Sequence, residues 1–177
     1  MTKAPGWNPS LPFAEIGRRA GVLHMVADDA LRRQVANDLD LEAVKQLSAD
    51  LVVRAWRDGA EIRGAVRAVV TRICGVSLEP FDETIDEPLK VIVVPQGSPN
   101  LPVGAGPGLD LDSQVDDPPE EAQGAAIELG AYVIEHLALA LAPFPRKPGA
   151  VFTPPPPSLA QSPFAALSSV KRTPSDT

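Results

Sequence analysis

Side chains that could serve as nucleophile or general base are few in this chain of 177 residues. Histidine occurs only at His24, inside a short apolar piece, and at His136, beside Glu135 in a helical pattern. Neighbours along a helix do not face one another, so Glu135 cannot orient His136 as a catalytic triad demands. The sequence therefore predicts no enzyme activity and no catalytic residue.

The candidate metal ligands are also incomplete. Cys74 and Ser77 have Cys-x-x-Cys spacing, but a serine hydroxyl is a poor zinc ligand and Cys74 is the single cysteine. Residues 110–114 begin like a calcium loop, yet the glycine and the final glutamate of such loops are missing. We expect no metal and no cofactor, and we expect Cys74 to be a small buried residue.

A basic surface is the clearest candidate for binding chemistry. Residues 51–57 and 60–70 have the pattern of two strands, and the Asp-Gly pair at Asp58 is typical of a two-residue hairpin turn. This turn would place Arg54 opposite Arg63, and like charges side by side cost a few tenths of a kcal/mol. The hairpin therefore predicts a polar face on which cations are gathered.

Two interpretations of this face stay open. Its cations could meet phosphates while its indole stacks on a base. Alternatively, neighbouring carboxylates neutralise the cations within the protein, as on many charge-alternating sheets. The candidate nucleic-acid-binding residues are Arg54, Trp56, Arg63 and Arg67.

Two helical patterns offer surfaces for a protein partner. The pattern over residues 127–141 has an apolar face and leaves Tyr132 and Leu139 on the other side. Residues 162–172 form a second, short amphipathic pattern, which could dock on its own domain or on a partner. Its candidate contact residues are Phe164, Leu167 and Val170.

Charge and composition limit the class of partner. The net charge is −7, and residues 79–136 alone hold 13 acidic residues and one basic residue. An acidic chain does not attract nucleic acid at long range, so we expect no DNA partner and favour a protein partner or a narrow RNA contact. The single cysteine, the lack of an apolar leader and the charged residues within 127–141 indicate a cytoplasmic protein with no membrane span.

The arrangement of elements predicts an α+β fold. An antiparallel sheet built around residues 51–94 would pack against helices near residues 28–47 and 127–141. Asp28 or Asp29 is the expected N-cap of the first helix, and Asp40 is expected to cap a second short helical turn.

The expected domain organisation follows from the positions of proline and glycine. Residues 1–142 would form a single domain, with a flexible acidic loop inserted at 95–121. Residues 143–177 would form a proline-rich tail that carries the short helix 162–172.

An ordered set of segments resembles the YceD family, the large ribosomal RNA subunit accumulation proteins. No single segment carries the resemblance, which spans about residues 10–172. The segments are Gly64-Ala65-Val66-Arg67-Ala68 leading to Cys74, Ser77-Leu78-Glu79-Pro80-Phe81, Ile127-Glu128-Leu129-Gly130 with Glu135, Leu137, Leu139 and Leu141, Pro143-Phe144-Pro145-Arg146-Lys147, and Ser162-Pro163-Phe164-Ala165-Ala166-Leu167 before Lys171-Arg172.

The resemblance implies an accessory role in the synthesis, processing or stability of large-subunit ribosomal RNA, without catalysis. The implied partner is that RNA or its precursor particle, reached directly or through a protein. The alternative is a cytosolic interaction or regulatory module unrelated to RNA. Many family members carry a Cys-x-x-Cys pair and a later His/Cys pair that look metal-binding. Here Ser77 stands at the second position of the first pair and Lys147 stands where a histidine often occurs.

Overall fold

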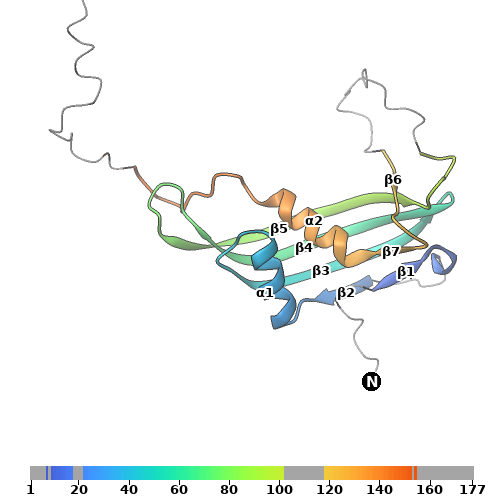
Figure 1. Ribbon diagram of the computed structural model, residues 1–177, viewed down its shortest axis with the longest axis horizontal. Coiled ribbons are helices and arrows are strands. Elements are labelled where there is room, and N and C mark those ends of the chain that lie inside the picture. The colour runs from blue at the N-terminus through green and yellow to red at the C-terminus, as the bar shows by residue number, and fades with distance from the viewer. Residues whose placement is uncertain (1–6, 8, 18–21, 102–117, 153, 155–177) are drawn as a thin grey trace, which may run out of the picture.

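The computed structural model describes residues 7, 9–17, 22–101, 118–152 and 154. Three long strands lie side by side, and two helices lie against them (Figure 1). A short 3-10 helix, Phe13–Glu15, follows the first strand. The elements are β1 (Ser10–Pro12), β2 (Val22–Val26), α1 (Asp29–Asp38), β3 (Ala43–Trp56), β4 (Gly59–Ile73), β5 (Pro80–Val94), β6 (Glu120–Glu121), β7 (Ala126–Glu128) and α2 (Leu129–Ala140).

The main sheet has the strand order β2-β3-β4-β5-β6. Its pairs are antiparallel except for the last, in which β6 runs parallel to β5. A separate ladder pairs β1 with β7, which ties the N-terminal part of the chain to the residues just before α2. The predicted α+β fold class, with helices packed on an antiparallel sheet, is confirmed.

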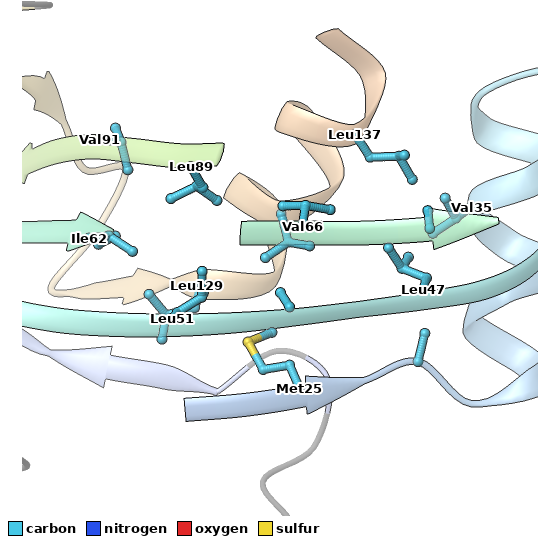
Figure 2. Packing of buried hydrophobic residues seen from close by; sticks show 14 of the residues in the cluster. Met25, Val35, Leu47, Leu51, Ile62, Val66, Leu89, Val91, Leu129 and Leu137 are labelled. Carbon is cyan, nitrogen blue, oxygen red and sulfur yellow. The ribbon is translucent and has the colours of Figure 1, made fainter. Parts of the chain in front are cut away.

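One face of the sheet is buried by both helices. Buried and exposed residues alternate along β4, as expected of a strand that is covered on one side only. Leu129 and Leu137 of α2 and Val35 of α1 point into the same core as Leu51 and Val66 of the sheet (Figure 2). The opposite face, called the outer face below, therefore carries the polar side chains of the strands.

The turn between β3 and β4 differs from the prediction. It consists of Arg57 and Asp58, and Gly59 is already a strand residue paired with Trp56. A Cβ atom on Gly59 would collide with the backbone of β5, 2.9 Å from the Cα of Val94 and closer still to the carbonyl oxygen of Val93. Glycine is thus required for close strand packing rather than for the turn. Arg57 supplies the positive φ of the turn, at 50°.

The changed turn shifts the register by two residues. Arg54 stands opposite Glu61, not opposite Arg63 as predicted. Arg63 stands between Val52 on β3 and Lys90 on β5. Because side chains alternate with a period of two, the shift leaves every residue on its predicted face. The expected Arg–Arg pair is therefore wrong, although both arginines lie on the outer face.

The second helical turn expected after Asp40 is also wrong. Asp40 has a φ of 53° and lies in the short connection between α1 and β3, which begins at Ala43. The register of β3 shifts between Val44 and Gln46, which marks a β-bulge. The extra residue of the bulge turns both Val44 and Leu47 toward the core. Their spacing of three therefore imitates a helix within a strand.

The predicted N-cap of the first helix is confirmed. The Asp28 carboxylate accepts a hydrogen bond of 2.9 Å from the backbone N–H of Leu31, which satisfies one of the free donors of the first turn. The C-terminal helix begins two residues later than predicted, because Ala126–Glu128 pairs with β1 as β7.

Parts of the predicted loop and tail are held against the domain. The backbone N–H of Gly97 donates to the Glu121 carboxylate, and β6 adds a short parallel edge strand beside Val93 and Val94. Pro145 and Lys147, at the start of the predicted tail, are hydrogen-bonded to the residues that join β4 to β5. The predicted helix 162–172 lies outside the described residues.

Candidate functional site

All four candidate nucleic-acid-binding residues lie on the outer face. Arg54 and Trp56 come from β3, and Arg63 and Arg67 come from β4. Their strand positions share one parity, so the side chains emerge on the same side of the sheet. The structure divides them into two groups according to their charged neighbours.

Arg67 belongs to a neutralised group. Its guanidinium lies 2.6 Å from Asp50 and 3.6 Å from Asp86. Asp50 also bonds the Nδ1 of His24 at 2.6 Å, and these two partners hold the pKa of its carboxyl below the usual value. Lys45 and Asp82 form a further pair nearby on the same sheet. In this group, neighbouring carboxylates neutralise the cations, as the second interpretation of the face predicts.

The other group contains four cations and two carboxylates, those of Asp58 and Glu61. Four cations lie at the end of the sheet near the β3–β4 turn and are called the basic end below: Arg54, Arg57, Arg63 and Lys90. Arg63 and Lys90 are directly opposite each other, which places like charges side by side. Arg63 also bonds Glu61 at 2.6 Å, and Arg54 has no ion-pair partner among the described residues. The sequence did not indicate Lys90, because its pairing depends on the register of β5.

Trp56 is half-buried and is already stacked. The Arg57 guanidinium lies 4.5 Å from the centre of its ring, in cation–π contact. The same guanidinium donates to the side-chain oxygen of Asn100 at 2.9 Å, and Asn100 donates to Asp58 at 2.7 Å. These bonds fix the turn and hold both Arg57 and Trp56 at the basic end.

The two partner-binding candidates on α2 differ in exposure, because Tyr132 is half-buried against the core and Leu139 is exposed. Leu139 is 76% exposed, and Tyr132 lies two turns earlier on the same side of the helix. Burial, with the charges of Glu120 and Glu135, raises the pKa of Tyr132 to about 12. Tyr132 lines a groove of about 580 Å³ whose wall also carries Glu120, Glu121, Glu128 and Glu135. Phe164, Leu167 and Val170 lie outside the described residues.

Cys74 occupies a second polar site, at the far end of the β4–β5 hairpin. Its thiol is buried, and the Sγ atom accepts three backbone N–H groups, from Val76 and Ser77 at 3.4 Å and from Lys147 at 3.3 Å. Cys74, Ser77 and Lys147, which the family resemblance connects, are therefore neighbours in the fold. The expectation of a buried Cys74 is confirmed.

The residues around Cys74 do not fit a zinc ion. Zinc in proteins takes thiolate, imidazole or carboxylate ligands, usually four of them. The described residues contain no group of three or more His, Cys, Asp or Glu that could hold a metal. The Lys147 ammonium has donors only and carries positive charge, so it would repel a cation at this place. It binds Glu79 at 2.8 Å instead.

The Cys74 site predicts a dependence of stability on pH. The Ser77 hydroxyl and backbone N–H, with the N–H groups of Lys147 and Val76, lower the pKa of the Cys74 thiol from 9.0 to about 6, although burial opposes the shift. Between pH 6 and 9 the unfolded thiol holds more of its proton than the folded one, so the free energy of unfolding should rise with pH. The contribution is complete above pH 9 and is lost as the pH falls through 6. Urea unfolding across this range should show the rise in the natural protein and its loss in Cys74→Ala; equal slopes would contradict the prediction.

The described residues include no helix that is both long and apolar enough to cross a membrane. Comparison with known proteins adds one finding: the family model "Large ribosomal RNA subunit accumulation protein YceD" matches residues 62–169. This match runs from β4 through the Cys74 site and α2 into the C-terminal region. No curated protein and no solved structure matches the chain. Because the family model covers more than half of the sequence, the chain belongs to the YceD family of large ribosomal RNA subunit accumulation proteins.

Proposed function

We propose that this protein acts in ribosome biogenesis by binding large-subunit ribosomal RNA, or its precursor particle, through the basic end of the outer face. It does so as a binding protein of the cytoplasm, without catalysing a reaction. The family description ties its members to accumulation of large-subunit ribosomal RNA. The observation that carries the direct contact is the surplus of cations around the Arg63–Lys90 pair.

A surplus of this kind needs a physical reason. Directly opposed cations on a sheet destabilise it by a few tenths of a kcal/mol, and a bound phosphate would reduce the repulsion that remains beside the Arg63–Glu61 pair. Arg54 and Arg63 are exposed, so both guanidinium groups can reach an RNA backbone. Trp56 and the stacked Arg57 add a planar surface beside them. Cations with a stacking platform are the usual means by which proteins hold single-stranded RNA.

The size of the basic end fits a narrow contact. It holds four cations and the carboxylates of Asp58 and Glu61, whereas elsewhere on the outer face Arg67 and Lys45 are paired with Asp50 and Asp82. The net charge of −7 would repel RNA from most other surfaces. Recognition of a short exposed segment is therefore favoured over wrapping of a long duplex.

A protein partner is the second candidate route to the ribosomal particle. The groove beside Tyr132 is lined by four glutamates, which favour a positively charged protein segment. Leu139 on the same side of α2 offers an exposed apolar contact. The same surface would also serve the alternative function, that of an interaction module unrelated to RNA.

The direct contact is tested by removing two cations at once. The Arg54→Gln, Arg63→Gln double variant should bind fragments of large-subunit ribosomal RNA at least about tenfold more weakly at low salt. The salt dependence should also become shallower, by roughly 0.7 per lost phosphate contact on single strands. Both quantities come from fluorescence anisotropy titrations of labelled RNA at several salt concentrations.

Lys45→Gln is the matched control, because Lys45 lies on the same sheet but belongs to the neutralised group. It should leave the affinity and the salt dependence close to those of the natural protein. An unchanged affinity in the double variant, with a normal unfolding midpoint, would refute the RNA contact at the basic end. Sedimentation of that variant with precursor large subunits would then point to the groove beside Tyr132.

A further inference from the structure

The chain after α2 returns to the end of the β4–β5 hairpin. Residues 142–147 are called the strap below, and residues 72–80 the hairpin end (Figure 1). Arg72 donates to the carbonyl oxygen of Ala142 at 2.5 Å, and the N–H of Gly75 donates to that of Pro145 at 2.9 Å. The contacts between strap and hairpin end are together called the clasp.

Lys147 completes the clasp with two further contacts. Its backbone N–H donates to the Sγ atom of Cys74, and its ammonium binds the Glu79 carboxylate at 2.8 Å. The ion pair raises the pKa of Lys147 and lowers that of Glu79. The strap is thus held at several points along its length, which a single surface ion pair would not achieve.

The hairpin end is itself shaped to receive the strap. The N–H of Cys74 donates to the carbonyl oxygen of Glu79, and the N–H of Leu78 donates to that of Cys74, both at 2.9 Å. Leu78 has a φ of 60°, an unfavourable value for leucine that these bonds must maintain. The turn presents the Cys74 sulfur to the strap and the Glu79 side chain to Lys147.

We infer that the clasp is metal-independent: the Lys147 ammonium bound to Glu79, and the N–H groups around the Cys74 sulfur, hold the strap where the family resemblance implies a metal ion. Three backbone N–H groups, rather than a metal cation, are the partners of the buried sulfur. Lys147 places its positive charge near both Glu79 and Cys74. The cross-link that two chain segments would share through a metal is made here by the side chains of Arg72, Cys74, Glu79 and Lys147 together with backbone groups.

The inference has a direct chemical test, because Cys74 is the single cysteine of the chain. The rate at which Ellman's reagent labels the thiol of the purified full-length protein reports on opening of the clasp. The rate should be the same with and without EDTA, since no metal has to be removed. Glu79→Gln should raise the rate roughly fivefold in both buffers, because the Lys147 side chain loses its partner.

Asp82→Asn is the matched control for Glu79→Gln. It breaks an exposed Lys–carboxylate pair that does not involve the strap, between Lys45 and Asp82 at 2.6 Å, and its amide oxygen can still accept from Thr71. Its labelling rate should equal that of the natural protein. An equal increase in both variants would overturn the inference, since the increase would then reflect general loosening of the sheet.

Two other results would overturn it directly. One is faster labelling of Cys74 in the natural protein after EDTA treatment, as expected if a metal protected the thiol. The other is a stoichiometric amount of zinc in the purified protein by elemental mass spectrometry. Neither measurement depends on RNA binding, so the clasp and the proposed function can fail independently.

Discussion

Gly64→Ala is expected to lower the free energy of unfolding by about 3 kcal/mol. Gly64 lies in the central strand β4, opposite Leu51 of β3 and Leu89 of β5. A Cβ atom there would lie 2.9 Å from the Cδ2 atom of Leu51 and would overlap the backbone carbonyl oxygen of Asp50. A leucine side chain can rotate away, but the backbone of a paired strand cannot move without stretching its hydrogen bonds. Urea unfolding followed by far-UV circular dichroism measures the loss.

Gly124→Ala is the control for this prediction. Gly124 lies between β6 and β7, and a Cβ atom added to it would meet no atom within 4 Å. Its unfolding midpoint should therefore stay close to that of the natural protein. Equal midpoints for the two variants would show that β3 and β4 are not packed as closely as described. In Gly64→Ala, the added methyl group should push the Asp50 backbone aside. This movement should also weaken the bonds from the Asp50 side chain to His24 and Arg67 on the outer face.

Leu137→Ala should cost about 3 kcal/mol of unfolding free energy, through lost burial and the cavity that remains. Leu137 is fully buried between α2 and the sheet, beside Leu129 and Val133 of the same helix. Truncation would leave α2 weakly attached, and the strap that follows it would be loosened as well. The loss can be measured by urea unfolding, and loosening of the strap by the labelling rate of Cys74.

Leu139→Ala gives the matched comparison on the same helix. Leu139 is 76% exposed, so its truncation should change the unfolding free energy by no more than about 0.5 kcal/mol. The pair also separates stability from recognition. If α2 docks on a protein partner, Leu139→Ala should weaken that complex without affecting the fold. A large loss of stability in Leu139→Ala would contradict the described orientation of the helix.

The sequence predicted the hairpin because its signal is local. Period-two alternation along β3 and β4 identifies both strands and both faces, and a register shift of two residues preserves the faces. For this reason Arg54, Arg63 and Arg67 were placed correctly on the outer face, although their pairing was wrong. The register itself depends on how closely Gly59 approaches Val93, which belongs to a strand more than thirty residues later.

Non-local features could not be read in the same way. The bulge at Val44 makes a strand resemble a helix, and only its pairing with β4 reveals it. Lys90 joins the basic end because it lies directly opposite Arg63 on the adjacent strand. The meeting of Lys147 with Cys74 spans 73 positions in the sequence, and no periodicity in either segment indicates it. In the sequence, only the family resemblance connects those residues.

The clasp also imposes an order on synthesis. Its final bonds need Lys147, which leaves the ribosome 73 residues after Cys74. Synthesis proceeds at about 5–20 residues per second, so the Cys74 sulfur and the Glu79 carboxylate would lack their bonds to Lys147 for several seconds. The antiparallel sheet can pair during that interval, since most of its contacts join neighbouring segments. Closure of the strap is therefore a late step, after which the only thiol of the chain becomes sheltered from disulfide exchange.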